Sequence, residues 1–178
     1  MNDMIQIELA LAFLGGHGTD GNGRLIERYF LFSDEELEGC HDWVQWAFPT
    51  DLISKFNPSS GLLPSDPIAL TSTQWANSAT ILNKFLNYLG LHLHDNVIDE
   101  NEDRFFSIVT SPSNHNILRL SRILRHLVLT GRGYYAFCLL DALLWLVKKH
   151  PERFNSDTVA YWCLTCYDFD NASSYFFR

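Results

Sequence analysis

The sequence is poor in the residues that support an exported protein. Its 178 residues include only four cysteines, and three of these lie in apolar or aromatic surroundings, where a free cysteine behaves as a small buried hydrophobic residue. The first residues, MNDMIQIELALAFLGG, contain no basic segment and do not resemble a signal peptide. We therefore expect a cytoplasmic protein with free thiols, because a reducing compartment is the default without an export signal.

Long apolar runs are also missing. The most apolar stretch, YYAFCLLDALLWLV at 134–147, is shorter than the roughly 20 residues that a membrane-spanning helix requires. No transmembrane segment is expected, and the stretch is typical of a buried helix. Asp141 is the one acid within it, and a buried carboxylate needs a partner. We predict that an arginine between residues 119 and 125 provides that partner.

Positive charge is scarce, and motifs for cofactors are weak. Thirteen lysines and arginines against 21 acids give a formal net charge of −8 and a pI of about 5.2, which disfavours general nucleic-acid binding.

GHGTDG at 16–21 has the spacing of a dinucleotide fingerprint, but helices rather than strands are expected after it. His92 and His94 lack an evident third ligand for a metal. No metal, cofactor or catalytic residue is assigned from the sequence.

The residues that are present predict an all-α protein. Ser33 and Glu36 have the spacing of a capping box, which predicts a helix from 33 to about 47 that is followed by Pro49. Residues 49–69 hold four of the six prolines, so a long irregular connection is expected there, with Leu52, Ile53, Phe56, Leu62 and Leu63 buried. Residues 3–14 fit a strand and a helix equally well.

The remaining helices have clear start or stop signals. Gly90 and Gly131 are expected to end two of them, and Pro151 follows a third. Residues 91–112 are expected to be mostly loop, and a short extended piece within them is left open. The other helices are predicted at 24–32, 72–89, 114–130, 133–149 and 156–166. The whole chain, 1–178, is therefore predicted to be a single-domain bundle of about six or seven helices.

The stretch CHDWVQWAFP at 40–49 concentrates aromatic side chains within the predicted helix 33–47. On a helical projection its apolar surface covers most of the circumference, which favours core packing for Trp43, Val44, Trp46 and Phe48. His41 falls on the inner side of this helix and is best interpreted as a core histidine. Gln45 lies beside the same face and could be its hydrogen-bond partner.

A second stretch, NHNILRLSRILRHL at 114–127, places positive charge on one side of a helix. Arg119, Arg122 and Arg125 share a face in a chain that is acidic overall. One interpretation is a solvated face that pairs with the chain's own acids. The other is a docking face for a carboxylate or phosphate, because guanidinium groups bind such anions bidentately. The helix start at Asn114–Asn116 also favours anions.

The order and spacing of these motifs resemble the conserved domain of the opioid growth factor receptor family. The chain has the D-x-x-G-R loop at Asp20–Arg24, the acidic turn at Ser33–Glu38, and the motifs at His41–Pro49 and Asn114–Leu127. The resemblance covers about residues 12–147. Val44 and Ala47 stand where the family usually has Ile and Leu. The long C-terminal extension of the animal proteins has no counterpart here, so their enkephalin binding is not carried over.

Together these observations predict a binding or interaction module for a peptide, a small anionic ligand or a protein partner. Two alternatives stay open: an enzyme that uses His41 or His115 as general acid or base, and arginines that are purely structural. The predicted ligand-binding residues are His41, Gln45, Trp46, Asn114, His115, Asn116, Arg119, Arg122 and Arg125.

Overall fold

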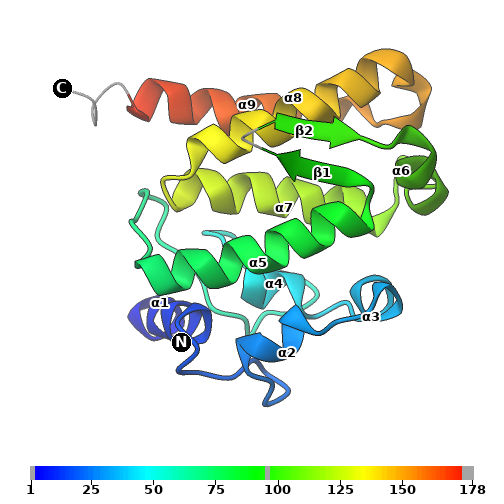
Figure 1. Ribbon diagram of the computed structural model, residues 1–178. Coiled ribbons are helices and arrows are strands. Elements are labelled where there is room, and N and C mark those ends of the chain that lie inside the picture. Colours follow the sequence, from blue (N-terminus) through cyan, green and yellow to red (C-terminus); the bar gives the residue numbers. More distant parts are fainter. Residues whose placement is uncertain (1–2, 95–96, 174–178) are drawn as a thin grey trace. The chain divides into compact units, whose positions relative to one another are not determined.

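The computed structural model describes residues 3–94 and 97–173, and it is mostly helical, as the sequence predicts (Figure 1). Nine α-helices and one two-stranded sheet fall within these residues, against the six or seven helices expected. The chain divides into two compact units, residues 1–88 and residues 89–178. Buried apolar side chains occur throughout both units.

The N-terminal unit is built around its longest helix, α5, which packs against α1, α2 and α3. Thr71 Oγ1 accepts a hydrogen bond from the backbone N–H of Gln74, whose own side chain accepts from the N–H of Thr71, so α5 begins with a capping box. The Nδ2 of Asn77 donates to the carbonyl of Leu14 at 2.8 Å and so holds the end of α1 on α5. The helices are α1 (Asp3–Leu14), α2 (Ile26–Phe30), α3 (Asp34–Gly39), α4 (Val44–Ala47) and α5 (Ser72–Tyr88).

The prediction of one helix from 33 to 47 is wrong in its second half. The capping box at Ser33 is present, but α3 ends at Gly39 and Cys40 has an extended backbone, with φ −82° and ψ 119°. Helix α4 begins only at Val44. The chain turns here because tertiary contacts outweigh helical propensity: the indole Nε1 of Trp43 donates back to the carbonyl of Leu37 at 3.2 Å.

The tryptophan-rich stretch forms the core of this unit, as predicted. The ring centroid of Trp43 lies 5.4 Å from that of Phe85, 6.2 Å from Phe48 and 6.4 Å from Tyr29. Trp43, Val44, Trp46 and Phe48 are all buried. Tilted and edge-on rings at these separations contribute beyond the area that they bury. The aromatic cluster therefore anchors α4 to α2 and α5.

The connection at 49–69 contains no helix or strand, but the prediction that its apolar residues are buried is largely wrong. Leu63 is buried, whereas Leu52, Ile53 and Phe56 are exposed, Phe56 by 81%. Polar contacts fix the backbone here instead, since Ser54 Oγ accepts from the N–H groups of both Phe56 and Asn57. The apolar side chains are left on the outside of this turn.

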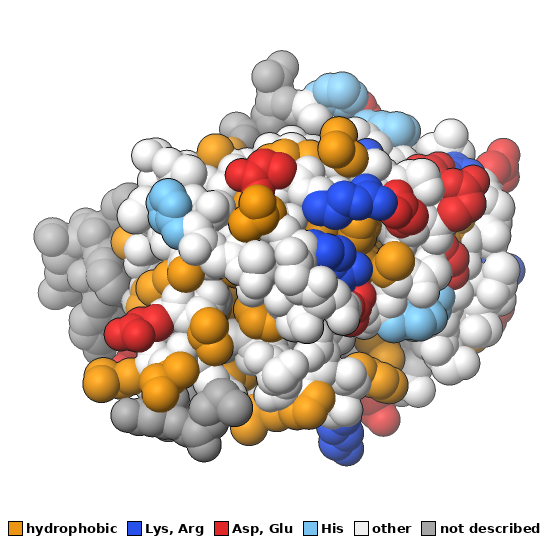
Figure 2. Space-filling model, turned by 90° about the horizontal axis from the view of Figure 1, so that it is seen from below, with side chains coloured by type: hydrophobic (Ala, Val, Ile, Leu, Met, Phe, Trp, Pro, Cys, Tyr) orange, Lys and Arg blue, Asp and Glu red, His pale blue; other side chains and the backbone are white. Residues whose placement is uncertain are grey.

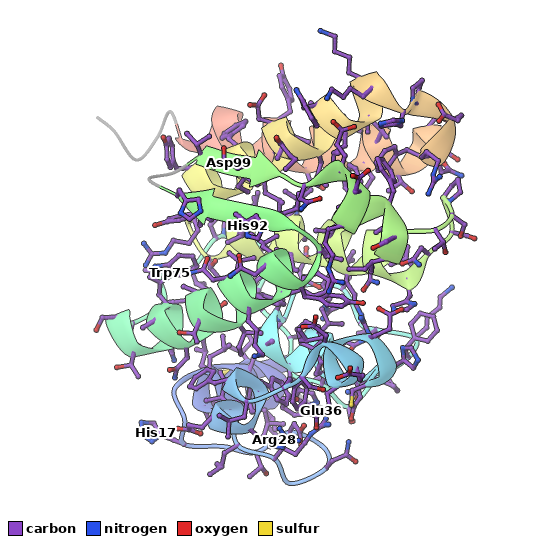
Figure 3. All side chains as sticks on the ribbon, turned by 45° about the vertical axis from the view of Figure 1, so that its right-hand side comes forward. His17, Arg28, Glu36, Trp75, His92 and Asp99 are labelled. Atoms are coloured by element: carbon purple, nitrogen blue, oxygen red, sulfur yellow. The ribbon has the colours of Figure 1, made fainter. Side chains whose placement is uncertain are left out.

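The C-terminal unit contains a β-hairpin and four α-helices within the described residues. The prediction of mostly loop over 91–112 allowed a short extended piece, which the hairpin bears out in kind, but it missed α6, although Asn101 caps this helix by accepting from the backbone N–H of Arg104. His92 and Asp99 are opposite each other in the hairpin (Figure 3). The elements are β1 (Leu91–His94), β2 (Val97–Glu100), α6 (Glu102–Ile108), α7 (His115–Leu129), α8 (Gly133–Lys149), the 3-10 turn η1 (Pro151–Arg153) and α9 (Ser156–Ser173).

Helices α7, α8 and α9 pack against one another and form the core of this unit. Gly131 has a φ of 69° after α7, the left-handed conformation that favours glycine at a helix end. The indole Nε1 of Trp162 on α9 donates to Ser121 Oγ on α7 at 2.7 Å. Helix α9 continues to Ser173, beyond the predicted end at 166. The four cysteines are thiols rather than disulfides, and Cys166 is the buried one.

Candidate functional site

The predicted ligand-binding residues fall into two groups, one in each compact unit. His41, Gln45 and Trp46 belong to the N-terminal unit, and the six residues between 114 and 125 belong to the C-terminal unit.

The three residues of the first group have different environments. His41 is exposed in the turn between α3 and α4, so the prediction of a core histidine is wrong. Gln45 is buried and its Nε2 donates to Ser54 Oγ at 3.4 Å, while its Oε1 has no hydrogen-bond partner among the described residues. Trp46 is buried with its ring centroid 5.5 Å from that of Phe13. The single helix on which all three residues were expected to lie is interrupted between Gly39 and Val44.

The start of α7 is closed by its own capping residue. The Oδ1 of Asn114 accepts from the backbone N–H of Asn116 at 2.9 Å, and its Nδ2 donates to the carbonyl of Ile108 at 3.1 Å. Asn114 therefore caps α7 at the position where the sequence predicted the helix to begin. Its amide ties the start of α7 to the end of α6.

The three arginines of α7 are not equally accessible. Arg119 is only 4% exposed, and its Nη1 donates to the Oδ1 of the buried Asn116 at 2.8 Å. Arg122 and Arg125 are half-buried. Arg119 therefore belongs to the interior, whereas Arg122 and Arg125 are partly exposed, with the Nη2 of Arg122 buried.

A narrow stripe of α7 remains open to solvent. His115, Leu118, Arg122 and Arg125 follow one another at spacings of three and four residues, which places them on one side of the helix. Leu118 is 55% exposed and the other three are half-buried. We call these four residues the α7 stripe.

The prediction that Asp141 is a buried acid is wrong. Its side chain is exposed on α8, so it does not require a buried cationic partner. The apolar composition of 134–147 does not imply burial on all sides, because α8 keeps one side in solvent.

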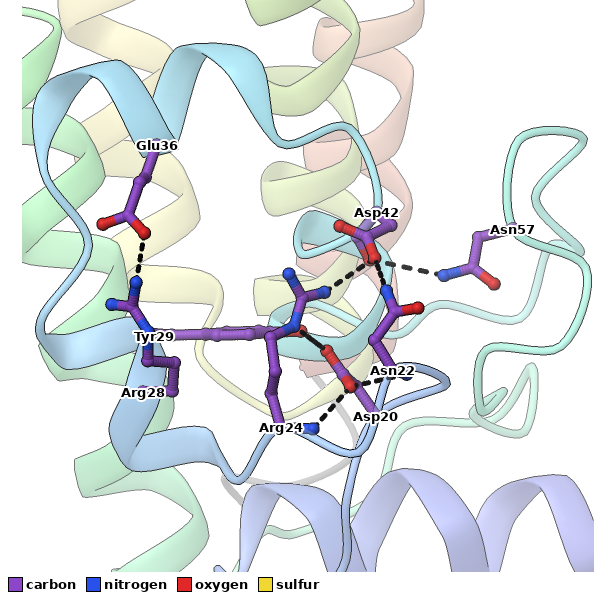
Figure 4. Close-up of polar contacts among 8 residues, drawn as sticks. All are labelled: Asp20, Asn22, Arg24, Arg28, Tyr29, Glu36, Asp42 and Asn57. Atoms are coloured by element: carbon purple, nitrogen blue, oxygen red, sulfur yellow. Dashed lines mark hydrogen bonds and ion pairs between the residues drawn. The ribbon is translucent and has the colours of Figure 1, made fainter.

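The most fully connected polar cluster of the N-terminal unit was not predicted as a site. It centres on Asp20, whose side chain is fully buried (Figure 4). Its Oδ2 accepts from Arg24 Nε at 2.5 Å and from the Tyr29 hydroxyl at 2.7 Å, and its Oδ1 accepts from the backbone N–H groups of Asn22 and Arg24. The resemblance placed Asp20 and Arg24 in a D-x-x-G-R loop but assigned them no role.

Arg24 connects this loop to the turn before α4. Its Nη2 donates to Asp42 Oδ2 at 2.7 Å, and its guanidinium carbon lies 5.3 Å from the centroid of the Tyr29 ring. Asn57 Nδ2 donates to the backbone carbonyl of Asp42 at 3.3 Å, which joins the irregular connection to the same turn. The cluster therefore ties together three segments that have little regular structure.

The electrostatics of the cluster keep Asp20 charged. Burial alone would raise the pKa of Asp20, but the hydrogen bonds from Tyr29, Arg24 and Asn22 outweigh it, and the pKa lies below its ordinary value. Burial and the hydrogen bond to this carboxylate raise the pKa of Tyr29 well above its usual range. A charged, fully bonded aspartate and a protonated tyrosine are suited to holding loops in place.

Ion pairs also stabilise the surface of this unit. Arg28 on α2 pairs with Glu36 on α3, and their side chains point toward each other in Figure 4. On the face drawn in Figure 2, basic side chains lie next to acidic ones, while hydrophobic side chains gather mainly at the lower left. The exposed charges on this face are therefore interspersed in sign.

A comparison with known families identifies the family to which the chain belongs. The model of the opioid growth factor receptor (OGFr) conserved region matches residues 24–172, which is most of the chain. The chain belongs to this family. The OGFr conserved region thus covers α2 to α9, including Arg24, Asp42 and all of α7, while Asp20 precedes the matched residues. Neither curated proteins nor solved structures gave a match to the chain.

Within residues 3–94 and 97–173, none of the helices has an apolar stretch long enough to cross a bilayer. The same residues contain no group of three histidines, cysteines or acids arranged to hold a metal ion.

Proposed function

We propose that this OGFr-family chain is a binding module that receives a peptide or a small anionic ligand on the α7 stripe. The observation that carries the proposal is the position of Arg122 and Arg125, half-buried beside the exposed Leu118, in a chain with a net charge of −8. Cations gathered on one helix of an acidic protein favour an anionic partner over a cationic one.

The chemistry of the stripe suits a carboxylate that is attached to an apolar group. A guanidinium group binds a carboxylate or phosphate through two parallel N–H···O bonds, and partial burial strengthens such pairs. Leu118 offers an apolar contact one helical turn from Arg122. His115 lies in the first turn of α7, where anions are favoured. An acidic side chain or a chain terminus of a peptide meets these requirements.

The buried arginine has a supporting role in this proposal. Arg119 lies behind the stripe and contacts Asn116, so we assign it to positioning the first turn of α7. This agrees, for Arg119, with the interpretation of the arginines as structural. The contribution of His41, Gln45 and Trp46 from the N-terminal unit stays a prediction, and of these three only His41 is exposed.

The enzyme alternative has less support. It requires His41 or His115 to meet a second titratable group in a concave pocket. His41 is exposed, and neither histidine lines the cavity between Val97–Ile98 and residues 137–142. We therefore retain the binding module as the proposed function.

The proposal is tested by nuclear magnetic resonance titration of the full chain with three capped tripeptides. Each peptide has leucine at both ends and glutamate, glutamine or lysine in the middle. The glutamate peptide is expected to shift the amide signals of α7. Replacing both accessible arginines, as Arg122→Gln with Arg125→Gln, is expected to weaken its binding about tenfold, because two charge-assisted contacts are lost.

The matched control removes two positive charges elsewhere in the same unit. Arg104→Gln with Lys148→Gln changes exposed cations outside α7 and is expected to leave the affinity for the glutamate peptide within about twofold. If the control variant weakens binding as much as the α7 variant, net charge rather than the stripe attracts the peptide. Unchanged binding by the α7 variant would remove the proposed site.

A further inference from the structure

A cavity of about 240 Å³ lies between β2 and α8 in the C-terminal unit. Its lining includes no residue of the α7 stripe. Most of its wall is apolar, and Val97 at its edge is 62% exposed. One carboxylate, that of Asp141, belongs to the lining. The lining residues are Val97, Ile98, Phe137, Cys138, Asp141 and Ala142.

The solvent-facing side of α8 extends this cavity into an aromatic stripe. Tyr134, Phe137, Asp141 and Trp145 follow at spacings of three and four residues, so they share one side of the helix. Tyr134 is 61% exposed, and Phe137 and Trp145 are each more than one-third exposed. Exposed aromatic side chains beside a cavity are typical of surfaces that bind another molecule.

The charge around the cavity is negative. Asp141 lies on its wall, and Asp99 and Glu100 follow its two β2 residues directly. Burial raises the pKa of Glu100, and the charges of Asp99 and Asp141 raise it further, while Lys149 acts in the opposite direction. Lys149 is itself paired with Glu102. A cation placed at Asp141 would therefore meet a field that favours it.

On the aromatic side of α8, the ring of Trp145 already contacts the ammonium group of Lys149. The Nζ of Lys149 lies 3.6 Å from the centroid of the Trp145 ring, while its charge is paired with Glu102. Aromatic faces attract ammonium and guanidinium groups. This contact shows how a basic side chain and an aromatic residue of α8 combine when an acid is near.

The size of the cavity limits what it can hold. At about 240 Å³ it falls below the roughly 300–1,000 Å³ of pockets that enclose a whole small-molecule ligand. A single long side chain is a better match. The stem of a lysine or arginine is apolar and its end is charged, which fits apolar walls with one carboxylate.

The thiol on the cavity wall does not suggest covalent chemistry. Burial raises the pKa of Cys138, so at neutral pH its sulfur is held mainly as the thiol. The thiolate is the nucleophilic form of cysteine, and reactive cysteines have a lowered pKa. Cys138 is therefore best regarded as part of an apolar wall.

We propose that this cavity receives a lysine or arginine side chain of a partner polypeptide. The stem packs against Val97 and Phe137, and the charged end pairs with Asp141. The flanking apolar residues of the partner lie along Tyr134 and Trp145. The partner segment is thus basic and apolar, opposite in charge to the ligand of the α7 stripe.

The three capped tripeptides also test this inference. The lysine peptide is expected to shift the amide signals of Val97, Ile98 and residues 137–142, and the glutamine and glutamate peptides are not. Asp141→Asn is expected to weaken binding of the lysine peptide about fivefold, the upper range for one exposed ion pair. The binding should also weaken as salt is added.

Glu152→Gln is the matched control, because it removes an exposed negative charge from the same unit outside the cavity lining. It is expected to leave the affinity for the lysine peptide within about twofold. Equal binding of the glutamine peptide, unchanged binding by Asp141→Asn, or shifts outside the cavity would each overturn the inference. The glutamate peptide and the α7 variant test the proposed function separately from the cavity. A negative result for one site therefore leaves the proposal for the other site standing.

Discussion

The hydroxyl group of Tyr29 donates a hydrogen bond of 2.7 Å to Oδ2 of Asp20, a carboxylate that is fully buried. A buried charge that loses a donor is costly, because water cannot replace the bond. We predict that Tyr29→Phe lowers the free energy of unfolding of the N-terminal unit by about 2 kcal/mol. Urea unfolding followed by tryptophan fluorescence measures this change.

Tyr88→Phe is the control for that variant. The Tyr88 hydroxyl also donates to a carboxylate, that of Glu38, but this contact is only partly buried. Solvent can replace the lost bond, so a change below about 1 kcal/mol is expected. Equal effects of the two substitutions would mean that the burial of Asp20 does not determine the strength of its contacts.

The low pKa of Asp20 predicts how stability responds to acid. Because the folded-state pKa lies below the unfolded value of about 4, the ionised group contributes its full stabilisation above about pH 4. This contribution is lost as the pH falls from there through the folded-state pKa. Asp20→Asn is expected to be less stable than the wild type at pH 7, with a difference that narrows below about pH 4.

The acid response of Tyr29→Phe separates this mechanism from general charge repulsion. Loss of the Tyr29 hydrogen bond removes one of the contacts that lower the pKa of Asp20, so the acid-induced loss of stability should still begin near about pH 4 but should be smaller, and end at a higher pH, than in the wild type. Thermal unfolding between pH 7 and pH 3 provides the comparison. Identical acid profiles for the two proteins would contradict the assignment of this acid response to Asp20.

The close approach of the irregular connection to α1 gives a prediction that depends on sterics alone. A Cβ atom added at Gly61 would lie 2.6 Å from the backbone nitrogen of Ala10, whereas one added at Gly39 would meet no atom within 4 Å. We predict that Gly61→Ala destabilises the chain by about 1–3 kcal/mol. Gly39→Ala should be neutral or slightly stabilising. Urea midpoints of the two variants test the difference.

How far the sequence predicts the fold depends on whether a signal is local. The capping box at Ser33 and the glycine after α7 are local, and both predictions were confirmed. The end of α3 has no local signal. The chain turns there because Trp43 donates to the carbonyl of Leu37 and Asp42 accepts from Arg24, and a helical pattern cannot reveal these contacts. A cap at Asn101 followed by two acids could have predicted α6 and was overlooked.

The candidate sites, like the fold, could be predicted only where the signal is local in the sequence. The concentration of arginine on 114–127 is visible in the sequence, but the burial of Arg119 depends on its contact with Asn116 and on packing around α7. The exposure of Asp141 follows from which side of α8 faces α7 and α9, and composition does not determine that side. The cavity joins β2 to α8 across about 40 residues of chain, so no local pattern predicts it.

The burial of Arg119 leads to a prediction that separates structure from ligand binding. Arg119→Ala removes the donor to Asn116 Oδ1 and the packing of a buried side chain, so we expect a loss of about 2–3 kcal/mol in the free energy of unfolding. Arg104→Ala, at an exposed position, should change it by less than about 0.5 kcal/mol. Urea unfolding of both variants is the measurement. If Arg119→Ala were as stable as the wild type and yet lost the glutamate peptide, Arg119 would contact the ligand directly and its assignment to positioning α7 would be wrong.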